Sequence, residues 1–222
     1  MIRSLSRRVV TLGTVLMLAL GSAFAQQSLV IASTGEADNL DPRVATDVRS
    51  FERISTIMEP LVVFDRGLGL EPRLATAWHF NDDATQLTFE LREGVTFHHG
   101  RVFSAEDVIY TFEWVLDENN GSTNRALYTD IESMAAPDPL TVVFQLRRPN
   151  AFLLNNIARM PIVPADLGDN EDFVVSPSGT GPFKLVSWVR DESLDLVAFE
   201  EYWGGRARVD QVSFRPIPED GT

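Results

Sequence analysis

A series of short strand-like runs, most of them ended by turn residues, constrains the fold of this chain most strongly. Several runs alternate apolar and polar residues with the period of two that is typical of a half-buried strand. Strands are predicted at 29–32, 61–65, 86–91, 142–146, 183–188, 194–200 and 211–217. Because helical patterns lie between some of these strands, the sequence predicts an α+β fold with hairpins, not a regular doubly wound sheet.

Two helices are predicted from apolar residues at helical spacing. The first runs from about Asp47 to Glu59 and ends at Pro60, and Asp47 is a suitable N-cap. The second begins after Ser104, which Asp107 follows at the spacing of a capping box. Its apolar stripe comprises Val108, Ile109, Phe112, Val115 and Leu116. The carboxylates at this helix start are therefore expected to have a structural role.

Other segments have less regular patterns. Residues 70–80 are predicted to form a proline-started turn of helix, and residues 85–97 a hairpin that turns at Gly94. A short helix is predicted at 149–160, and a loop rich in glycine and proline at 176–183.

The first 25 residues have the features of an export signal. Three arginines precede an apolar run at 9–20, and the segment ends in an A-x-A sequence. The apolar run is shorter than the roughly 20 residues that span a bilayer. We therefore expect cleavage after Ala25 and a soluble, periplasmic mature protein, with the Sec and twin-arginine routes both open.

The composition excludes several kinds of site. The chain has no cysteine, which rules out disulfides, thiolate metal sites and cysteine nucleophiles, so its stability has to come from an apolar core. Its formal net charge is −13, and removal of the three signal arginines would make it −16. Such an acidic surface repels nucleic acid and anionic lipid, and we expect neither as a partner.

Two adjacent histidines, His98 and His99, raise the question of a metal or catalytic site. Consecutive residues of an extended chain point to opposite sides, and only His79 remains as a further nitrogen ligand. We interpret 98–100 as a turn between the predicted hairpin and the helix that follows.

Common catalytic and nucleotide-binding motifs are missing from the sequence. It contains no G-x-S-x-G elbow, no H-E-x-x-H pair and no P-loop. Gly179 and Gly181 precede Pro182 and a predicted strand, whereas a phosphate site would need a helix N-terminus there. We expect no catalytic residue, no metal and no cofactor.

Six motifs resemble, in order, those of one known family. They are LDP, EPLVVFD, EPRLATAW, LTFELREGVTFHHGRVFSAEDVIYTFE, SGTGPFKLVSW and FEEYWGG. Together they resemble the extracytoplasmic solute-binding proteins of family 5, which serve ABC importers of peptides, nickel and related solutes. The resemblance extends from about Leu29 to Pro218. One departure is His99, which stands where the family commonly has the aspartate of an F-x-D-G turn.

This resemblance implies a periplasmic-binding-protein-like fold, in which two lobes close over a solute by a hinge motion. Family members are more than twice as long, so the chain would be an incomplete first lobe, with the second lobe absent. Residues 26–60 and 180–222 would form the sheet subdomain of that lobe. Residues 61–179 would form an additional subdomain.

The resemblance also implies two ligand-contacting segments. By position, they are Thr46, Asp47 and Val48 after the LDP motif, and Arg159 with Met160 at the end of a short helix. Asp47 also fits the N-cap of the first helix, and both roles stay open at this point.

The function implied by the resemblance is that of a solute receptor. Such a receptor binds a peptide or similar small polar solute without chemical change and delivers it to the permease subunits of an ABC importer. It would be a monomer that meets the membrane only through the permease. A secreted hydrolase with catalytic residues beyond Thr222 is the alternative, and a scavenging protein that uses this lobe alone is a third reading. The sequence does not identify the solute.

Overall fold

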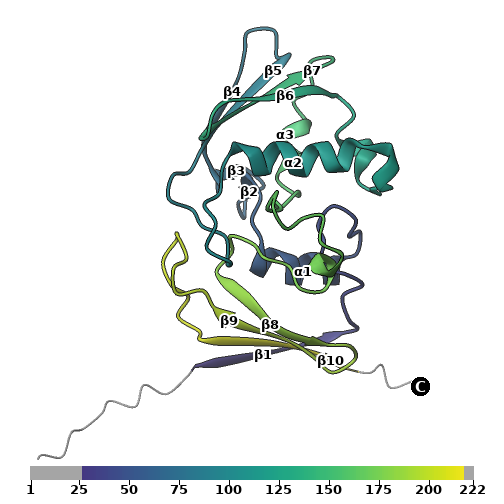
Figure 1. The fold of residues 1–222 in the computed structure, drawn as a ribbon, viewed down its shortest axis with the longest axis vertical. Coiled ribbons are helices and arrows are strands. Elements are labelled where there is room, and N and C mark those ends of the chain that lie inside the picture. Colours follow the sequence, from purple (N-terminus) through teal and green to yellow (C-terminus); the bar gives the residue numbers. More distant parts are fainter. Residues whose placement is uncertain (1–26, 218–222) are drawn as a thin grey trace, which may run out of the picture.

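The computed structural model describes residues 27–217, so the predicted export signal lies outside the described part of the chain. Figure 1 shows two four-stranded sheets at opposite ends of the molecule. Helices α1 (Val48–Ile57) and α2 (Ala105–Leu116) lie between these sheets. The predicted α+β class is therefore confirmed.

One sheet, which we call the terminal sheet, joins the two ends of the described chain. Its strand order is β1-β10-β9-β8; β1 and β10 are parallel, and the other pairs are antiparallel. The strands are β1 (Ser28–Thr34), β8 (Phe183–Val189), β9 (Ser193–Ala198) and β10 (Gln211–Ile217). All four strands were predicted. The pairing of β1 with β10 was not, because it joins residues that are far apart in the sequence, and the local apolar pattern carries no information about such a pairing.

The other four-stranded sheet, the central sheet, is antiparallel with the order β4-β5-β7-β6. Its strands are β4 (Ala75–Phe80), β5 (Gln86–Leu91), β6 (Ile131–Asp138) and β7 (Thr141–Leu146). The short strands β2 (Val62–Phe64) and β3 (Leu70–Pro72) pair with each other. Strand β6 was not predicted, because most of its residues are exposed and its sequence has no apolar alternation.

The predicted turn of helix at 70–80 is wrong, because this segment forms β3 and β4. Trp78 pairs with Phe89, and Phe80 with Leu87, across the ladder between β4 and β5. All four side chains belong to or pack against one apolar core. Pro72 is the last residue of β3, in the two-stranded sheet of β2 and β3. A proline at this position does not interrupt the ladder of a central strand. The apolar cross-strand pairs thus stabilise a strand at 70–80, although the local sequence pattern predicted a helical turn.

The predicted hairpin at 85–97 is wrong in its second half. Strand β5 already pairs with β4 on one side and with β7 on the other, so it has no free edge for the returning residues. The chain does turn at Gly94, with a φ of +76°. Beyond this turn, Thr96 forms an isolated bridge with Val102, and Phe97 N–H donates to the carbonyl of Arg101.

Apart from the turn of helix at 70–80, the predicted helices are present, although α1 and α3 (Leu153–Ile157) are shorter than expected. Single turns of 3-10 helix lie at Glu118–Asn120, Arg125–Leu127 and Glu171–Val174. Every helix in the described part of the chain is too short or too polar to cross a membrane.

Each four-stranded sheet has its own apolar core. Between α2 and the central sheet, Phe144 makes edge-to-face contacts with Phe89 and Phe112. Between α1 and the terminal sheet, Ile54 packs in a cluster with Phe214. Aromatic contacts of this geometry add to the free energy gained by burial alone.

The strands of the terminal sheet fall within 26–60 and 180–222, and those of the central sheet within 61–179. Val163 and Phe173, however, pack in the core of the terminal sheet. The division into two subdomains therefore stays a prediction, and the segment at its later boundary contacts both parts.

Asp107, at the start of α2, is a buried anchor as well as a helix cap. Its Oδ2 accepts the N–H of Ser104 at 2.9 Å. Its Oδ1 accepts the N–H of Ala165 at 2.9 Å and a guanidinium N–H of Arg101. The neighbouring Glu106 is exposed and only approaches Arg101, at 3.5 Å. The structural role predicted for these carboxylates is confirmed and rests mainly on Asp107.

We predict that Asp107→Asn lowers the free energy of unfolding by about 3 kcal/mol, because the neutral amide leaves Arg101 without its buried charged partner. Glu106→Gln, the matched control in the same helical turn, should cost less than about 0.5 kcal/mol. Urea unfolding at pH 7 measures both. Equal losses in the two variants would show that Asp107 is no more than a surface charge.

His98 and His99 contact the glycine-proline loop at 176–183 through different atoms. The buried His98 reaches the carbonyl of Gly181 with Nε2, at 2.9 Å. His99 reaches the hydroxyl of Ser178 with Nδ1, at 2.7 Å. Both residues therefore belong to a turn that is bonded to this loop.

His98 is held as a neutral imidazole. Because the N–H of Gly179 donates to Nδ1 at 3.3 Å, the ring proton lies on Nε2, which donates to Gly181. Burial lowers the pKa of His98 to about 4; the Gly181 carbonyl acts in the opposite direction, and Lys184 and His99 lower the pKa further.

The lowered pKa of His98 predicts a loss of stability as the pH falls from about 6.5 to about 4. In that window His98 is protonated in the unfolded chain but stays neutral in the folded chain. This difference lowers the free energy of unfolding by an amount on the order of 3 kcal/mol. His98→Gln should remove this part of the pH dependence, whereas His79→Gln, at an exposed position of β4, should keep it. Urea unfolding between pH 4 and pH 7 is the measurement, and identical profiles for His98→Gln and the wild type would refute the prediction.

Candidate ligand-binding cleft

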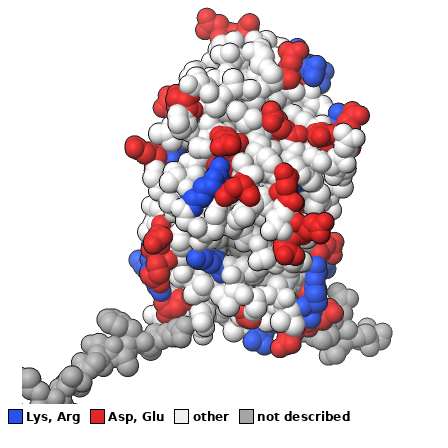
Figure 2. Space-filling view, in the orientation of Figure 1, with Lys and Arg blue, Asp and Glu red and all other residues white. Residues whose placement is uncertain are grey.

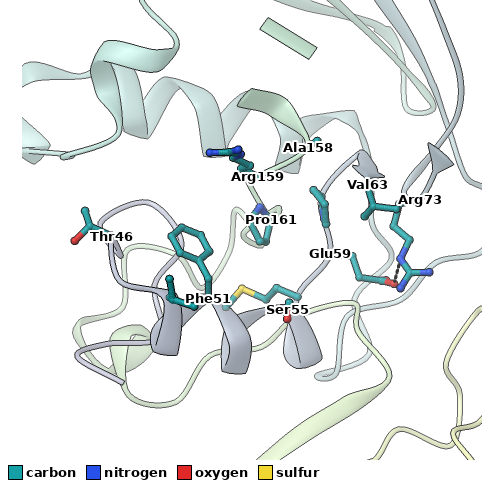
Figure 3. Close-up of a pocket in the computed structure, with 12 residues that line it drawn as sticks. Thr46, Phe51, Ser55, Glu59, Val63, Arg73, Ala158, Arg159 and Pro161 are labelled. Carbon is teal, nitrogen blue, oxygen red and sulfur yellow. Dashed lines mark ion pairs between the residues drawn. The ribbon is translucent and has the colours of Figure 1, made fainter. Parts of the chain in front are cut away.

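A cleft of about 670 Å³ lies between α1 and the segment that follows α3. Thr46 and one face of α1 form one wall, and residues 158–161 lie opposite (Figure 3). Glu59 and Arg73 lie at one end of the cleft, close to each other. The cleft is thus built from segments that the sequence separates by about a hundred residues.

The lining combines an apolar surface with a few polar groups, which is typical of small-molecule sites. The apolar residues are Val48, Phe51, Met58, Pro60, Val63, Ala158 and Pro161. Thr46 and Ser55 supply hydroxyls, and Glu59, Arg73 and Arg159 supply charges. Within residues 27–217, no three His, Asp or Glu side chains lie close enough to hold a metal ion. The lining can bind a solute by apolar contact and hydrogen bonds.

Helix α1 divides its apolar residues between two surfaces. Ile54 and Ile57 are fully buried in the core of the terminal sheet. Val48 is 73% exposed, and together with Phe51 it faces the cleft. The apolar pattern that predicted this helix therefore reflects both core packing and the cleft lining.

Two of the three ligand contacts predicted at the start of α1 line the cleft. These are Thr46, just before the helix, and Val48, its first residue. Asp47 is not part of the lining, and its Oδ1 accepts the N–H of Ser50 at 2.9 Å as the N-cap. Burial acts to raise the pKa of Asp47, but hydrogen bonds from Ser50 and the backbone outweigh this effect and lower it. Ligand contact by these residues stays a prediction.

The second predicted segment is split between the cleft and the core. Arg159 is exposed, and Figure 3 shows it on the opposite side of the cleft from Phe51. Met160 is 1% exposed and packs in the core of the central sheet, away from the lining. The side chains of these neighbouring residues point in different directions. Arg159 therefore lines the cleft, whereas Met160 lies in the core.

Glu59 is a buried carboxylate that sequence analysis did not single out. Its oxygens accept hydrogen bonds from Tyr202 Oη at 2.6 Å, Trp203 Nε1 at 2.7 Å and Thr180 Oγ1 at 3.1 Å. Arg73 Nε lies 3.0 Å from Glu59 Oε1. Since the residue is only 2% exposed, these four groups offset the cost of removing its charge from water.

The partners of Glu59 come from distant parts of the chain. Glu59 opens the EPLVVFD motif, and Tyr202 and Trp203 lie in the FEEYWGG motif more than 140 residues later. Burial raises the pKa of Tyr202, and the hydrogen bond to Glu59 raises it further. The only sequence signal for this site was that both motifs occur in the same family, which does not say that they touch.

Gly179 and Gly181 allow the glycine-proline loop to lie against the end of α1. Gly181 N–H donates to the carbonyl of Ile57 at 2.9 Å. A Cβ atom at Gly179 would lie 2.1 Å from the same oxygen, and one at Gly181 would lie 2.7 Å from it. Neither position accepts a side chain unless α1 moves, so this loop sets the position of one cleft wall.

Asp41 and Arg43 fix the chain before the other end of α1. The buried guanidinium of Arg43 binds both carboxylate oxygens of Asp41 and donates to the carbonyl of Gly168 at 2.7 Å. It also stacks on the ring of Trp114, 4.0 Å from the ring centroid. The segment that contains Thr46 is thereby tied to α2.

Comparison with known proteins places the chain among solute-binding proteins. Residues 69–222 match the family described as bacterial extracellular solute-binding proteins, family 5 Middle. Protein XP55 of Streptomyces lividans is 34% identical over 207 residues, which cover 90% of this chain and 37% of the relative. The glutathione-binding protein GsiB of Escherichia coli strain K12 is 30% identical over 219 residues, covering 96% and 43%.

A solved structure shares both the fold and part of the sequence. The periplasmic binding protein DppA of Helicobacter pylori, in complex with the peptide STSA, has a TM-score of 0.80 and 32% identity. The match covers 86% of this chain and 43% of DppA. The chain thus spans about 40% of the length of these relatives, and its fold is that of part of a periplasmic binding protein. Because the family model matches more than half of the sequence, the chain belongs to family 5 of the bacterial extracellular solute-binding proteins.

Proposed function

We propose that the protein is the solute receptor of an ABC importer and binds a peptide or a similar small polar solute outside the cytoplasm. The observation that carries this proposal is the cleft between α1 and residues 158–161, with its apolar lining and few polar groups. Family membership supports a binding role, and the ligands named for GsiB and DppA support this class of solute. These relatives give no support to the hydrolase alternative.

The proposed mechanism is binding without chemical change. The lining would hold the solute by apolar contact with α1 and by hydrogen bonds from hydroxyl and guanidinium groups. A second lobe that covers the open side of this cleft would come from further sequence, since the matched relatives are more than twice as long as this chain. Closure of that lobe over the cleft would create the form that the permease recognises.

The remaining features of the proposal concern location and assembly. The signal at 1–25 would be cleaved after Ala25, and the receptor would act in the periplasm as a monomer. Its contact with the membrane would be through the permease subunits alone, and it would need no cofactor.

An uptake experiment tests the proposed function. A strain that lacks the gene should lose import of labelled tripeptides that the parent strain takes up. The purified complete protein, including any sequence encoded after Thr222, should bind the same tripeptides and release them unchanged. Hydrolysis of bound tripeptide with repeated turnover, or unaltered uptake in the deletion strain, would reject the proposal.

Val48 offers a direct test of the cleft wall, because its side chain is exposed and contributes little to the core. We expect Val48→Ser to weaken tripeptide binding about tenfold, the effect of losing about 1–2 kcal/mol of apolar burial against the solute. The melting temperature should stay unchanged. Val102→Ser, at an exposed valine outside the cleft, is the matched control. Calorimetric titration is the measurement. Equal affinities of the two variants would show that α1 is not part of the binding site.

A further inference from the structure

We propose, on the basis of the proposed function, that the tip of the β2–β3 hairpin, residues 65–69, is a docking element for the permease. In this docking, Leu68 enters an apolar pocket of a permease subunit. Three features of the hairpin support this assignment: the conformation of Leu68, the rigid loop that holds it, and the place of the hairpin at one end of the cleft.

Leu68 combines exposure with backbone strain. Its side chain is 80% exposed, and it packs in neither of the two apolar cores. Its φ of +66° lies in the left-handed region, where a leucine is strained and a glycine is not. The chain therefore places a large apolar side chain at a position where glycine would be more stable, without a contact among residues 27–217 that offsets the strain. Such a residue indicates a contact outside the described chain.

The loop around Leu68 is held in one shape by Asp65. The carboxylate Oδ1 of Asp65 accepts the N–H of Gly67 at 2.6 Å and that of Gly69 at 2.8 Å. The N–H of Asp65 donates to the carbonyl of Gly69 at 2.8 Å, and the N–H of Leu68 donates to the carbonyl of Asp65 at 3.2 Å. A Cβ atom at Gly69 would lie 2.9 Å from Asp65 Oδ2, so the close approach of this carboxylate needs glycine there. A loop that is ordered before docking loses little conformational entropy when a partner binds.

The base of the hairpin forms one end of the cleft. Val63 in β2 and Arg73, directly after β3, both belong to the cleft lining, whereas Leu68 does not. Because five residues span at most about 18 Å, Leu68 lies within that distance of Val63. In Figure 1 the hairpin lies between the two four-stranded sheets. A permease that accepts the solute has to face the cleft, and the tip of this hairpin is then within its reach.

The surroundings of the tip favour a protein partner over a lipid surface. The chain has a net charge of −13, and acidic side chains are spread over the face seen in Figure 2, which disfavours contact with an anionic membrane. Next to the tip lies a hollow of about 530 Å³, and its lining consists of Phe64, Asp65, Arg66, Gly67 and Glu71. A projecting leucine beside a hollow is a relief that a complementary protein surface can follow.

The test measures ATP hydrolysis by the importer, reconstituted in vesicles, as a function of the concentration of tripeptide-loaded receptor. Leu68→Asn in the complete protein should raise the half-maximal concentration about tenfold, because one apolar side chain is no longer buried in the permease. Tripeptide affinity should stay unchanged and the melting temperature should not fall, since asparagine adopts a positive φ more readily than leucine. Leu68→Met, which keeps an apolar side chain, should retain most of the stimulation.

Ala84→Gly is the matched control, because it relieves a positive φ of +54° at another turn without removing a large apolar side chain. Its stimulation curve should match that of the wild type. An unchanged half-maximal concentration for Leu68→Asn would reject the docking role and leave the proposed function intact. Weaker tripeptide binding by Leu68→Asn would also reject it and assign the tip to closure of the second lobe. Failure of the loaded wild-type receptor to stimulate ATP hydrolysis would reject the proposed function, and the docking role with it.

Discussion

The buried carboxylate of Glu59 is the point at which the end of α1 meets residues from the last part of the chain. A carboxylate that is 2% exposed is stable only if the groups that donate hydrogen bonds to it or pair with its charge stay in place. Tyr202 and Trp203 approach it from beyond β9, Thr180 from the glycine-proline loop, and Arg73 from beyond β3. This shared polar contact is therefore one of those that join the two sheets, each of which has its own core.

The shape of the cleft follows from the same contact. The backbone carbonyl of Glu59 accepts the N–H of Ile162 at 2.9 Å, which positions the wall that includes Arg159. On the other side, Gly181 binds the carbonyl of Ile57 and leaves no room for a side chain beneath α1. Both cleft walls are thus fixed within a few residues of the carboxylate. A ligand that contacts Arg73 would act on this junction directly.

The sequence predicts the structure correctly where the relevant interaction is local. The N-cap at Asp47 and the start of α2 at Asp107 depend on partners within three residues, and both were predicted. The predictions at 70–80 and 85–97 were wrong, because the pairing of these strands depends on residues that are distant in the sequence. The candidate contacts at Thr46, Val48 and Arg159 came from resemblance to a family, and only the fold brought them to one cleft. Glu59 escaped notice because its side-chain partners are remote in sequence.

Native-state hydrogen exchange of Glu59→Ala tests most directly whether this carboxylate couples the two sheets. The substitution leaves the donors of Tyr202 and Trp203 without an acceptor. We predict that amide protection in β1 and β10 falls by at least about 2 kcal/mol while β5 and β7 keep theirs, because the terminal sheet then opens separately. Unchanged protection in all four strands, or an equal loss in all four, would contradict the claim that Glu59 couples the sheets.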